Sequence, residues 1–349
     1  MVLFLLEKTM SSTQNPSRIA IGILVPDYPP PLPRPSAKPI GYAVQNPINK
    51  NIRIVFGNKI KQQSGKVLMS GLTIKNDSWI PITQEILALH DRFPSQIRAS
   101  HFQTILPYTK ELIFGNPFEI TMLCRDKIQT QIYLENYGIR MPKICTKYEE
   151  FSDMIAKWTL GFLKPQFGAL GKNVQALTPS NALIPEFLEG VVPNKQEKTF
   201  IQQGIQAPKG WKGLSLRQLI QRNTDGSWNV LPAVLRRSKQ DLVVNVSRGA
   251  EAVLAEEHLP LETMEIIYEQ SISTALALQN HPEGQYSVEF GLDFVIDQNY
   301  QPWLIEVNSR PRGRLEVLAK RNPERFASLH QQACVAPILF LAEQVNQRN

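Results

Sequence analysis

Gly291-Leu292-Asp293-Phe294-Val295-Ile296-Asp297 and Trp303-Leu304-Ile305-Glu306-Val307-Asn308 are the two stretches that decide the fold. Their alternating patterns are typical of β-strands, in which side chains two residues apart lie on the same face. Asp293 therefore shares a face with Val295, and Glu306 shares a face with Asn308. Paired strands over 286–296 and 302–307, joined by a turn at 297–299, would bring Asp293, Glu306 and Asn308 together.

These three oxygen-bearing side chains form a ligand set that suits Mg²⁺, which keeps its other positions for water and phosphate oxygens. The alternative is an amphipathic hairpin whose acidic residues line its solvent side. The flanking Leu, Phe, Val and Ile residues favour a sheet with both faces shielded, where a carboxylate needs a partner. The hairpin thus predicts a Mg²⁺ site made of Asp293, Glu306 and Asn308.

A lysine and a glycine-bearing loop precede this hairpin. Residues 161–165 are predicted to form a short strand that carries Lys164 and leads into a loop with Gly168 and Gly171. Glycines let backbone N–H groups approach a phosphate without a side-chain collision. The loop matches neither a Walker motif nor a dinucleotide fingerprint, so an ordinary turn stays the alternative for the loop alone.

Two helices and a pair of arginines complete the pattern. Asp126 is a good N-cap for a helix that ends at Gly138, and residues 261–280 have helical spacing. The predicted core face of the second helix comprises Met264, Ile267, Ile272, Leu276 and Leu278. In Leu235-Arg236-Arg237-Ser238, an arginine could neutralise a phosphate or an acyl-phosphate oxyanion, although most arginines are simply exposed.

The first third of the chain has a different character. Residues 1–118 carry 13 Lys and Arg against 6 Asp and Glu, and 7 of the 14 residues from 26 to 39 are proline. We expect a small, basic α/β or β-rich N-terminal domain with an extended Pro-rich loop. Nucleic-acid binding is the alternative use of this charge. Because the charges are dispersed, a solvated basic surface is favoured and nucleic acid is not expected as a partner.

The amino-acid composition further limits the class of protein to which this chain can belong. The 349 residues are 42% hydrophobic and 20% charged, and no apolar run approaches the ~18 to 20 residues of a membrane-spanning helix. The three cysteines and five histidines have neither zinc-ligand spacing nor a disulfide framework. We therefore predict a soluble protein of the reducing cytoplasm, with no membrane partner.

The ordered set of motifs resembles the ATP-grasp superfamily of carboxylate–amine ligases, over roughly residues 119–345. More closely, the chain resembles the YheC/YheD group of endospore-coat-associated ATP-grasp proteins. The residues that carry this likeness are Asp126-Lys127, Lys164 with its loop, Gln202-Gln203-Gly204-Ile205, Arg237, Asn245, Asp293 and Glu306-x-Asn308. The Leu-Arg that follows the hinge and Trp-Leu-Ile-Glu-Val-Asn-Ser near the end are further cues.

The resemblance implies an α/β protein in which two α+β lobes hold ATP behind a smaller basic N-terminal domain. It predicts domains at 1–118, 119–200 and 201–349. It implies that Lys127 and Lys164 touch the ATP phosphates and that the loop from Gly168 to Gly171 closes over them. It also implies that the hinge residues Gln202, Gln203 and Ile205 contact adenine and that Ser215 lies at the ribose. Arg237 would bind the γ-phosphate or the acyl phosphate. Asp293, Glu306 and Asn308 would bind Mg²⁺.

The activity implied is an ATP- and Mg²⁺-dependent ligase that joins a carboxylate to an amine through an acyl phosphate. Arg237 and Lys164 would be its catalytic residues, and neither substrate can be identified from the motifs. The alternative is a catalytically silent ATP-binding or structural protein of spore-coat assembly. Spore-coat proteins are the implied partners, and a homodimer is the default among symmetric assemblies.

Overall fold

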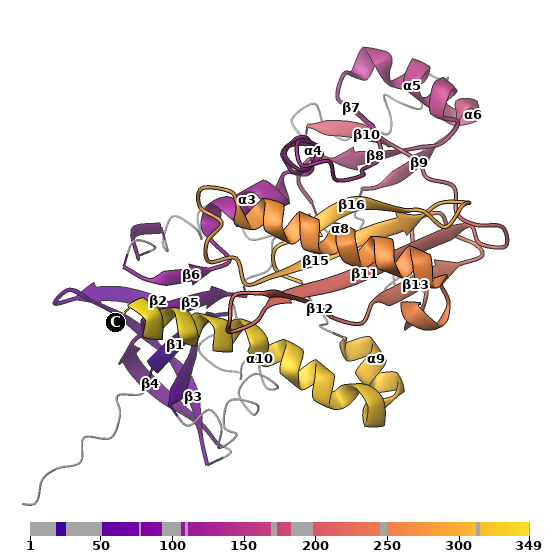
Figure 1. The fold of residues 1–349 in the computed structure, drawn as a ribbon. Helices are drawn as coiled ribbons and strands as arrows, with labels where there is room; N and C mark the ends of the chain where they lie inside the picture. Colours follow the sequence, from indigo (N-terminus) through magenta and orange to yellow (C-terminus); the bar gives the residue numbers. More distant parts are fainter. Residues whose placement is uncertain are drawn as a thin grey trace, which may run out of the picture.

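The computed structural model describes nine stretches of the chain, namely residues 19–25, 51–76, 78–92, 106–108, 111–168, 173–182, 198–244, 250–311 and 315–348. In this part the chain builds three β-sheets with helices packed against their faces (Figure 1). The predicted Pro-rich loop at 26–39 lies outside the described residues.

The first sheet has the strand order β4-β3-β2-β1-β5-β6. Its strands are β1 (Ile19–Leu24), β2 (Ile52–Gln63), β3 (Lys66–Lys75), β4 (Ser78–Glu85), β5 (Ala88–Asp91) and β6 (Ile113–Gly115). Strand β1 pairs in parallel with β2 and β5, and β5 pairs in parallel with β6. Strands β2, β3 and β4 form an antiparallel meander, so the predicted strand content of this region is confirmed.

The last helix, α10 (Pro323–Arg348), covers this first sheet although it lies at the opposite end of the sequence (Figure 1). Ile338 and Leu341 of α10 pack in one core with Ile21 and Ile23 of β1. Removal of this apolar surface from water stabilises the arrangement by roughly 25 cal/mol per Å². The two ends of the described chain therefore share one hydrophobic core.

The second sheet has the order β7-β10-β8-β9. Its strands are β7 (Ile144–Cys145), β8 (Gly161–Pro165), β9 (Gln175–Leu177) and β10 (Thr199–Gln203). Helix α5 (Phe151–Trp158) packs Phe151 and Ile155 against the sheet, and the short helix α6 (Pro179–Ala182) follows β9. The predicted boundary after residue 200 falls inside β10, and the division into three domains stays a prediction.

The third sheet has the order β14-β13-β11-β15-β16, with β12 paired to β11. Its strands are β11 (Gly213–Arg222), β12 (Trp228–Val230), β13 (Val234–Ser238), β14 (Glu251–Leu254), β15 (Glu289–Ile296) and β16 (Pro302–Asn308). Helix α8 (Leu261–Gln279) covers one face, and α9 (Glu316–Arg321) packs on the other (Figure 1). Strands β15 and β16 pair antiparallel, so the predicted hairpin is confirmed.

Helix α8 also confirms the predicted helix over 261–280, with one error in its predicted core face. Ile267 and Leu278 are fully buried, and Met264 and Ile272 pack partly buried against the same core. Leu276, however, is 43% exposed. It follows Ile267 by nine residues, which is two and a half helical turns, so it must lie on the opposite side of the helix.

No helix among the described residues has the length and apolar character that a membrane-spanning segment requires.

Candidate functional site

The β15–β16 hairpin brings the predicted oxygen ligands together. Asp293 lies directly opposite Glu306 in the strand register, and Asn308 lies opposite Gly291. The Asn308 side-chain amide donates to Asp293 Oδ2 at 3.1 Å. Phe290, Leu292 and Phe294 of β15 are buried in the core beneath α8, so alternation places Asp293 on the other face of the sheet.

Two arginines that the sequence interpretation did not assign to the site hold Asp293. Arg217 of β11 donates from Nε to Oδ1 at 2.7 Å and from Nη2 to Oδ2 at 2.6 Å. Arg236 of β13 donates to Oδ1 at 2.5 Å. With Asn308, these bonds occupy the four lone-pair positions of the carboxylate. Burial alone would raise the pKa of Asp293, but the two guanidinium groups outweigh burial and hold that pKa below its ordinary value.

Glu306 has the opposite character. Burial raises the pKa of Glu306 above its ordinary value, although the positive charges of Lys127, Arg217 and Lys164 act in the other direction. Its carboxylate makes no hydrogen bond within the described part of the chain. A partly buried carboxylate that lies among cations without a hydrogen bond is typical of a ligand-binding site.

Lys164 enters the site from β8 of the second sheet. Its Nζ donates to Gln202 Oε1 at 2.5 Å, and the Gln202 amide in turn donates to Gln131 Oε1 at 3.4 Å. The pKa of Lys164 is lowered to about 8, mainly by burial. The charge of Lys127 contributes to the lowering, whereas Glu306 and Asp293 oppose it. The predicted hinge residue Gln202 thus orients the predicted phosphate lysine.

Lys127 is the first residue of helix α4 (Lys127–Glu135), which follows α3 (Phe118–Arg125). Asp126 caps α4 as predicted, since its Oδ1 accepts from Ile128 N at 3.1 Å and from Gln129 N at 3.0 Å. Its Oδ2 accepts from the Gln166 amide at 2.7 Å, which ties the cap to the glycine loop. Lys127 Nζ reaches the same loop and donates to Gly168 O at 2.8 Å.

The remaining predicted contacts lie around these groups. Gln203 ends β10, and Ile205 follows in the segment that links the second sheet to β11 of the third. Ser215 lies in β11 on the face of Arg217, opposite Arg236 in the register, and is buried. Gly171 lies outside the described residues, as does Asn245.

The structure does not bring Arg237 to this group. Arg237 shares the face of Leu235, whose side chain is buried in the core beneath α8. Its Nε donates to Glu251 Oε2 at 2.7 Å, and its guanidinium lies 4.9 Å from the centre of the Trp211 ring. Its neighbour Arg236 points to the opposite face and bonds Asp293, because successive side chains of a strand alternate. That alternation was the signal in the sequence that could have separated the two arginines.

The donor set fits a nucleotide and a divalent cation. Among the buried polar atoms that have no hydrogen-bond partner in the described part of the chain, three belong to residues of this region: Ser215 Oγ, Arg236 Nε and Gln166 Oε1. Such atoms are costly unless a ligand or water bonds them. No group of three or more His, Cys, Asp or Glu side chains arranged to hold a metal ion occurs in the described stretches. Two carboxylates and an amide oxygen are nevertheless sufficient for Mg²⁺, which retains several waters.

Comparison with solved structures defines the fold. D-alanyl-alanine synthetase A from Vibrio cholerae superimposes with a TM-score of 0.60 over 92% of this chain and 99% of that one, at 12% sequence identity. Together with the facing lysines and acidic hairpin, this similarity shows an ATP-grasp fold. The chain belongs to the YheC/D-like ATP-grasp family, whose model matches residues 141–333.

Two curated relatives come from Bacillus subtilis strain 168. Endospore coat-associated protein YheD is 25% identical over 338 residues, which cover 81% of this chain and 72% of YheD. Endospore coat-associated protein YheC is 24% identical over 212 residues, which cover 53% of this chain and 57% of YheC. The match therefore spans less than two thirds of YheC.

Proposed function

We propose that this chain is an ATP- and Mg²⁺-dependent ligase that joins a carboxylate to an amine through an acyl phosphate. The observation that carries the proposal is the convergence of four cationic side chains on one buried and one partly buried carboxylate at the junction of the second and third sheets. The cations are Lys127, Lys164, Arg217 and Arg236, and the carboxylates are Asp293 and Glu306.

A carboxylate is a poor electrophile, and conversion into an acyl phosphate provides a leaving group that an amine can displace. The transfer brings anions together, so positive charge at the reacting phosphate is the main catalytic requirement. Lys127 and Lys164 would bind the phosphates, and the N-terminus of α4 beside Gly168 favours negative charge. Asp293, Glu306 and Asn308 would hold Mg²⁺, which when bound neutralises further phosphate charge.

The arginine contacts of Asp293 suggest how a cation gains access. Both oxygens of Asp293 are occupied by donors from Arg217, Arg236 and Asn308. Phosphate oxygens are equally good acceptors for guanidinium groups. We infer that Arg236 turns from Asp293 to the nucleotide phosphates and thereby releases a carboxylate oxygen for the cation.

The same contacts favour a second candidate, a structural protein of spore-coat assembly in which Arg217 and Arg236 permanently neutralise Asp293. The names of YheC and YheD support association with the spore coat under either proposal. The unpartnered Ser215 and Arg236 atoms and the raised pKa of Glu306 favour the ligand-binding alternative.

Thermal unfolding with Mg²⁺ alone and with Mg²⁺ plus ATP separates the two. ATP at a hundred times its dissociation constant adds ~2.7 kcal/mol, which raises the midpoint by roughly 5 to 10 °C. Lys164→Ala should abolish this rise, whereas Lys157→Ala, at an exposed position of α5, should retain it. A native chain with no rise at saturating ATP would contradict the ligase proposal and leave the structural one.

A further inference from the structure

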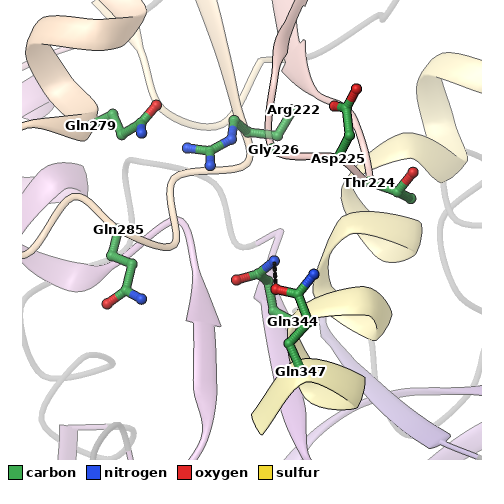
Figure 2. Close-up of a pocket in the computed structure, with 8 residues that line it drawn as sticks. All are labelled: Arg222, Thr224, Asp225, Gly226, Gln279, Gln285, Gln344 and Gln347. Carbon is green, nitrogen blue, oxygen red and sulfur yellow. Dashed lines mark hydrogen bonds between the residues drawn. The ribbon is translucent and has the colours of Figure 1, made fainter.

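A second polar pocket, of about 400 Å³, lies away from the site described above (Figure 2). It is formed by the end of β11, the turn into β12, the end of α8 and the last turns of α10. Arg222 lines it from β11, and by strand alternation Arg222 lies on the face opposite to Arg217. The volume is within the usual range for small-molecule sites, roughly 300 to 1,000 Å³.

Arg222 is buried in this pocket, and its guanidinium forms no direct ion pair within the described residues. Arg222 is only 8% exposed, and its Nε and Nη1 have no hydrogen-bond partner among the described residues. The guanidinium lies 5.1 Å from the ring centre of Trp228 and 4.8 Å from that of Phe340. These rings fix its position and exclude water, so two of its donors are left unsatisfied, at a free-energy cost that an anion would remove.

Asp225 also lines the pocket and its charge acts on Arg222, but its carboxylate does not bond the guanidinium. Asp225 is exposed, and its Oδ1 accepts from the backbone N of Ser227 at 2.8 Å and from the Ser227 hydroxyl at 2.7 Å. In Figure 2 the Asp225 carboxylate points away from the pocket, whereas Arg222 reaches toward Gln279. The pocket therefore presents one cation without a bonded carboxylate.

Four glutamine side chains also line the pocket; they are neutral and can both donate and accept hydrogen bonds. Gln279, Gln285, Gln344 and Gln347 line the same pocket as Arg222 and come from three segments of the chain. Gln279 Oε1 accepts from the Trp228 indole at 2.7 Å, and the Gln344 amide donates to Gln347 Oε1 at 3.2 Å. Carboxamide side chains match the donors and acceptors of amide or hydroxyl groups on a ligand.

We propose that this pocket binds a small organic monocarboxylate whose neighbouring groups are neutral and polar, such as an N-acylated amino acid. The carboxylate pairs with Arg222, and the glutamine side chains bond the amide portion. A polyphosphate does not fit, because a single cation would face several negative charges. The ligand is distinct from the nucleotide, since the pocket and the Asp293 carboxylate lie on opposite faces of the sheet.

The test uses N-acetylglycine as the probe, with N-acetylglycinamide as a neutral probe of the same shape. Signals of arginine Nε–H groups are followed by NMR in the full chain, and the Arg222 signal is assigned by its loss in Arg222→Lys. The expected result is a saturable shift with N-acetylglycine and none with N-acetylglycinamide. Inorganic phosphate, the third probe, should bind more weakly than N-acetylglycine.

A charge variant isolates the role of Arg222 without removing it. Gln279→Glu keeps an acceptor for Trp228 but places a carboxylate beside the guanidinium, so affinity for N-acetylglycine should fall about tenfold or more. Gln240→Glu makes the same charge change at an exposed position outside the pocket and should leave affinity unchanged. Equal binding of the neutral probe, unaltered affinity in Gln279→Glu, stronger binding of phosphate, or no shift at the solubility limit of N-acetylglycine would each overturn the proposal.

Discussion

Arg217 and Asp293 lie directly opposite each other on the neighbouring strands β11 and β15, joined by two hydrogen bonds of 2.7 and 2.6 Å. Such a bidentate pair is stronger and more directional than a single ionic contact. The pair holds the acidic side chain that the hairpin pattern identified, and it fixes the position of Asp293 relative to Glu306.

Replacement of Arg217 should destabilise the fold. We expect Arg217→Gln to lower the free energy of unfolding by about 1 to 3 kcal/mol, because Asp293 loses two donors but retains Arg236. Chemical denaturation with urea measures the change. Arg325→Gln is the control, since Arg325 pairs with Glu257 at a half-exposed site, where a loss of about 0 to 1 kcal/mol is expected. Equal losses in the two variants would argue against the importance of the buried pair.

The two carboxylates should make opposite contributions to stability as pH changes. The pKa of Asp293 is held below its ordinary value of 3.8, so its contribution is present above that value and is lost as pH falls through the folded pKa. The pKa of Glu306 is raised above 4.5, so its stabilising contribution is present below 4.5 and is lost as pH rises through the folded pKa.

Relative to the native chain, Asp293→Asn should therefore be less stable at pH 7, and the difference should shrink on acidification. Glu306→Gln should be more stable at pH 7, with the difference disappearing below about pH 4.5. Urea unfolding across this pH range, without nucleotide or Mg²⁺, measures both. A stability loss at pH 7 in Glu306→Gln would contradict the raised pKa.

Nucleotide affinity should depend on the protonation of Lys164. Because burial lowers the pKa of Lys164 to about 8, we expect the affinity for Mg²⁺–ATP to be constant near pH 7 and to fall as pH rises above 8. The protonated amine attracts phosphate, whereas the neutral amine does not. Calorimetric titration at several pH values provides the measurement. Lys164→Gln should bind more weakly and lose this dependence, and a native-like pH profile in that variant would assign the transition to another group.

Neighbouring arginines of β13 offer a matched pair of variants. Arg236→Gln should weaken Mg²⁺–ATP binding at least about tenfold, because a charge-assisted bond to phosphate is worth about 1.5 to 3 kcal/mol. Arg237→Gln should leave affinity within about threefold, since Arg237 bonds Glu251 on the other face of the strand. The opposite ranking would restore Arg237 as the phosphate-binding arginine.

Local patterns were sufficient for much of the fold. The hairpin around 297–299, the capped helix that begins after Asp126 and the strand that carries Lys164 all follow from alternation, capping and turn chemistry within a few residues. The convergence of Asp293, Glu306 and Asn308 was likewise predictable, because register follows from the hairpin and faces follow from alternation.

Contacts between distant segments were decided only by the tertiary structure. The arginine partners of Asp293 come from β11 and β13, and the sequence does not specify the order of the strands in this sheet. Helix α10 returns to cover β1, more than 300 residues earlier in the chain. Leu276 of α8 is exposed although its side chain is apolar.

The sequence by itself determined the kinds of residue, the faces they occupy and the order of the motifs, because these depend on backbone geometry over short distances. The tertiary structure decided which charges meet, that Arg236 rather than Arg237 reaches Asp293, and that buried Arg222 shares a pocket with four glutamines. Burial and electrostatic pairing depend on the whole packed chain, since each charge is stabilised or destabilised by groups that packing alone brings within a few ångströms.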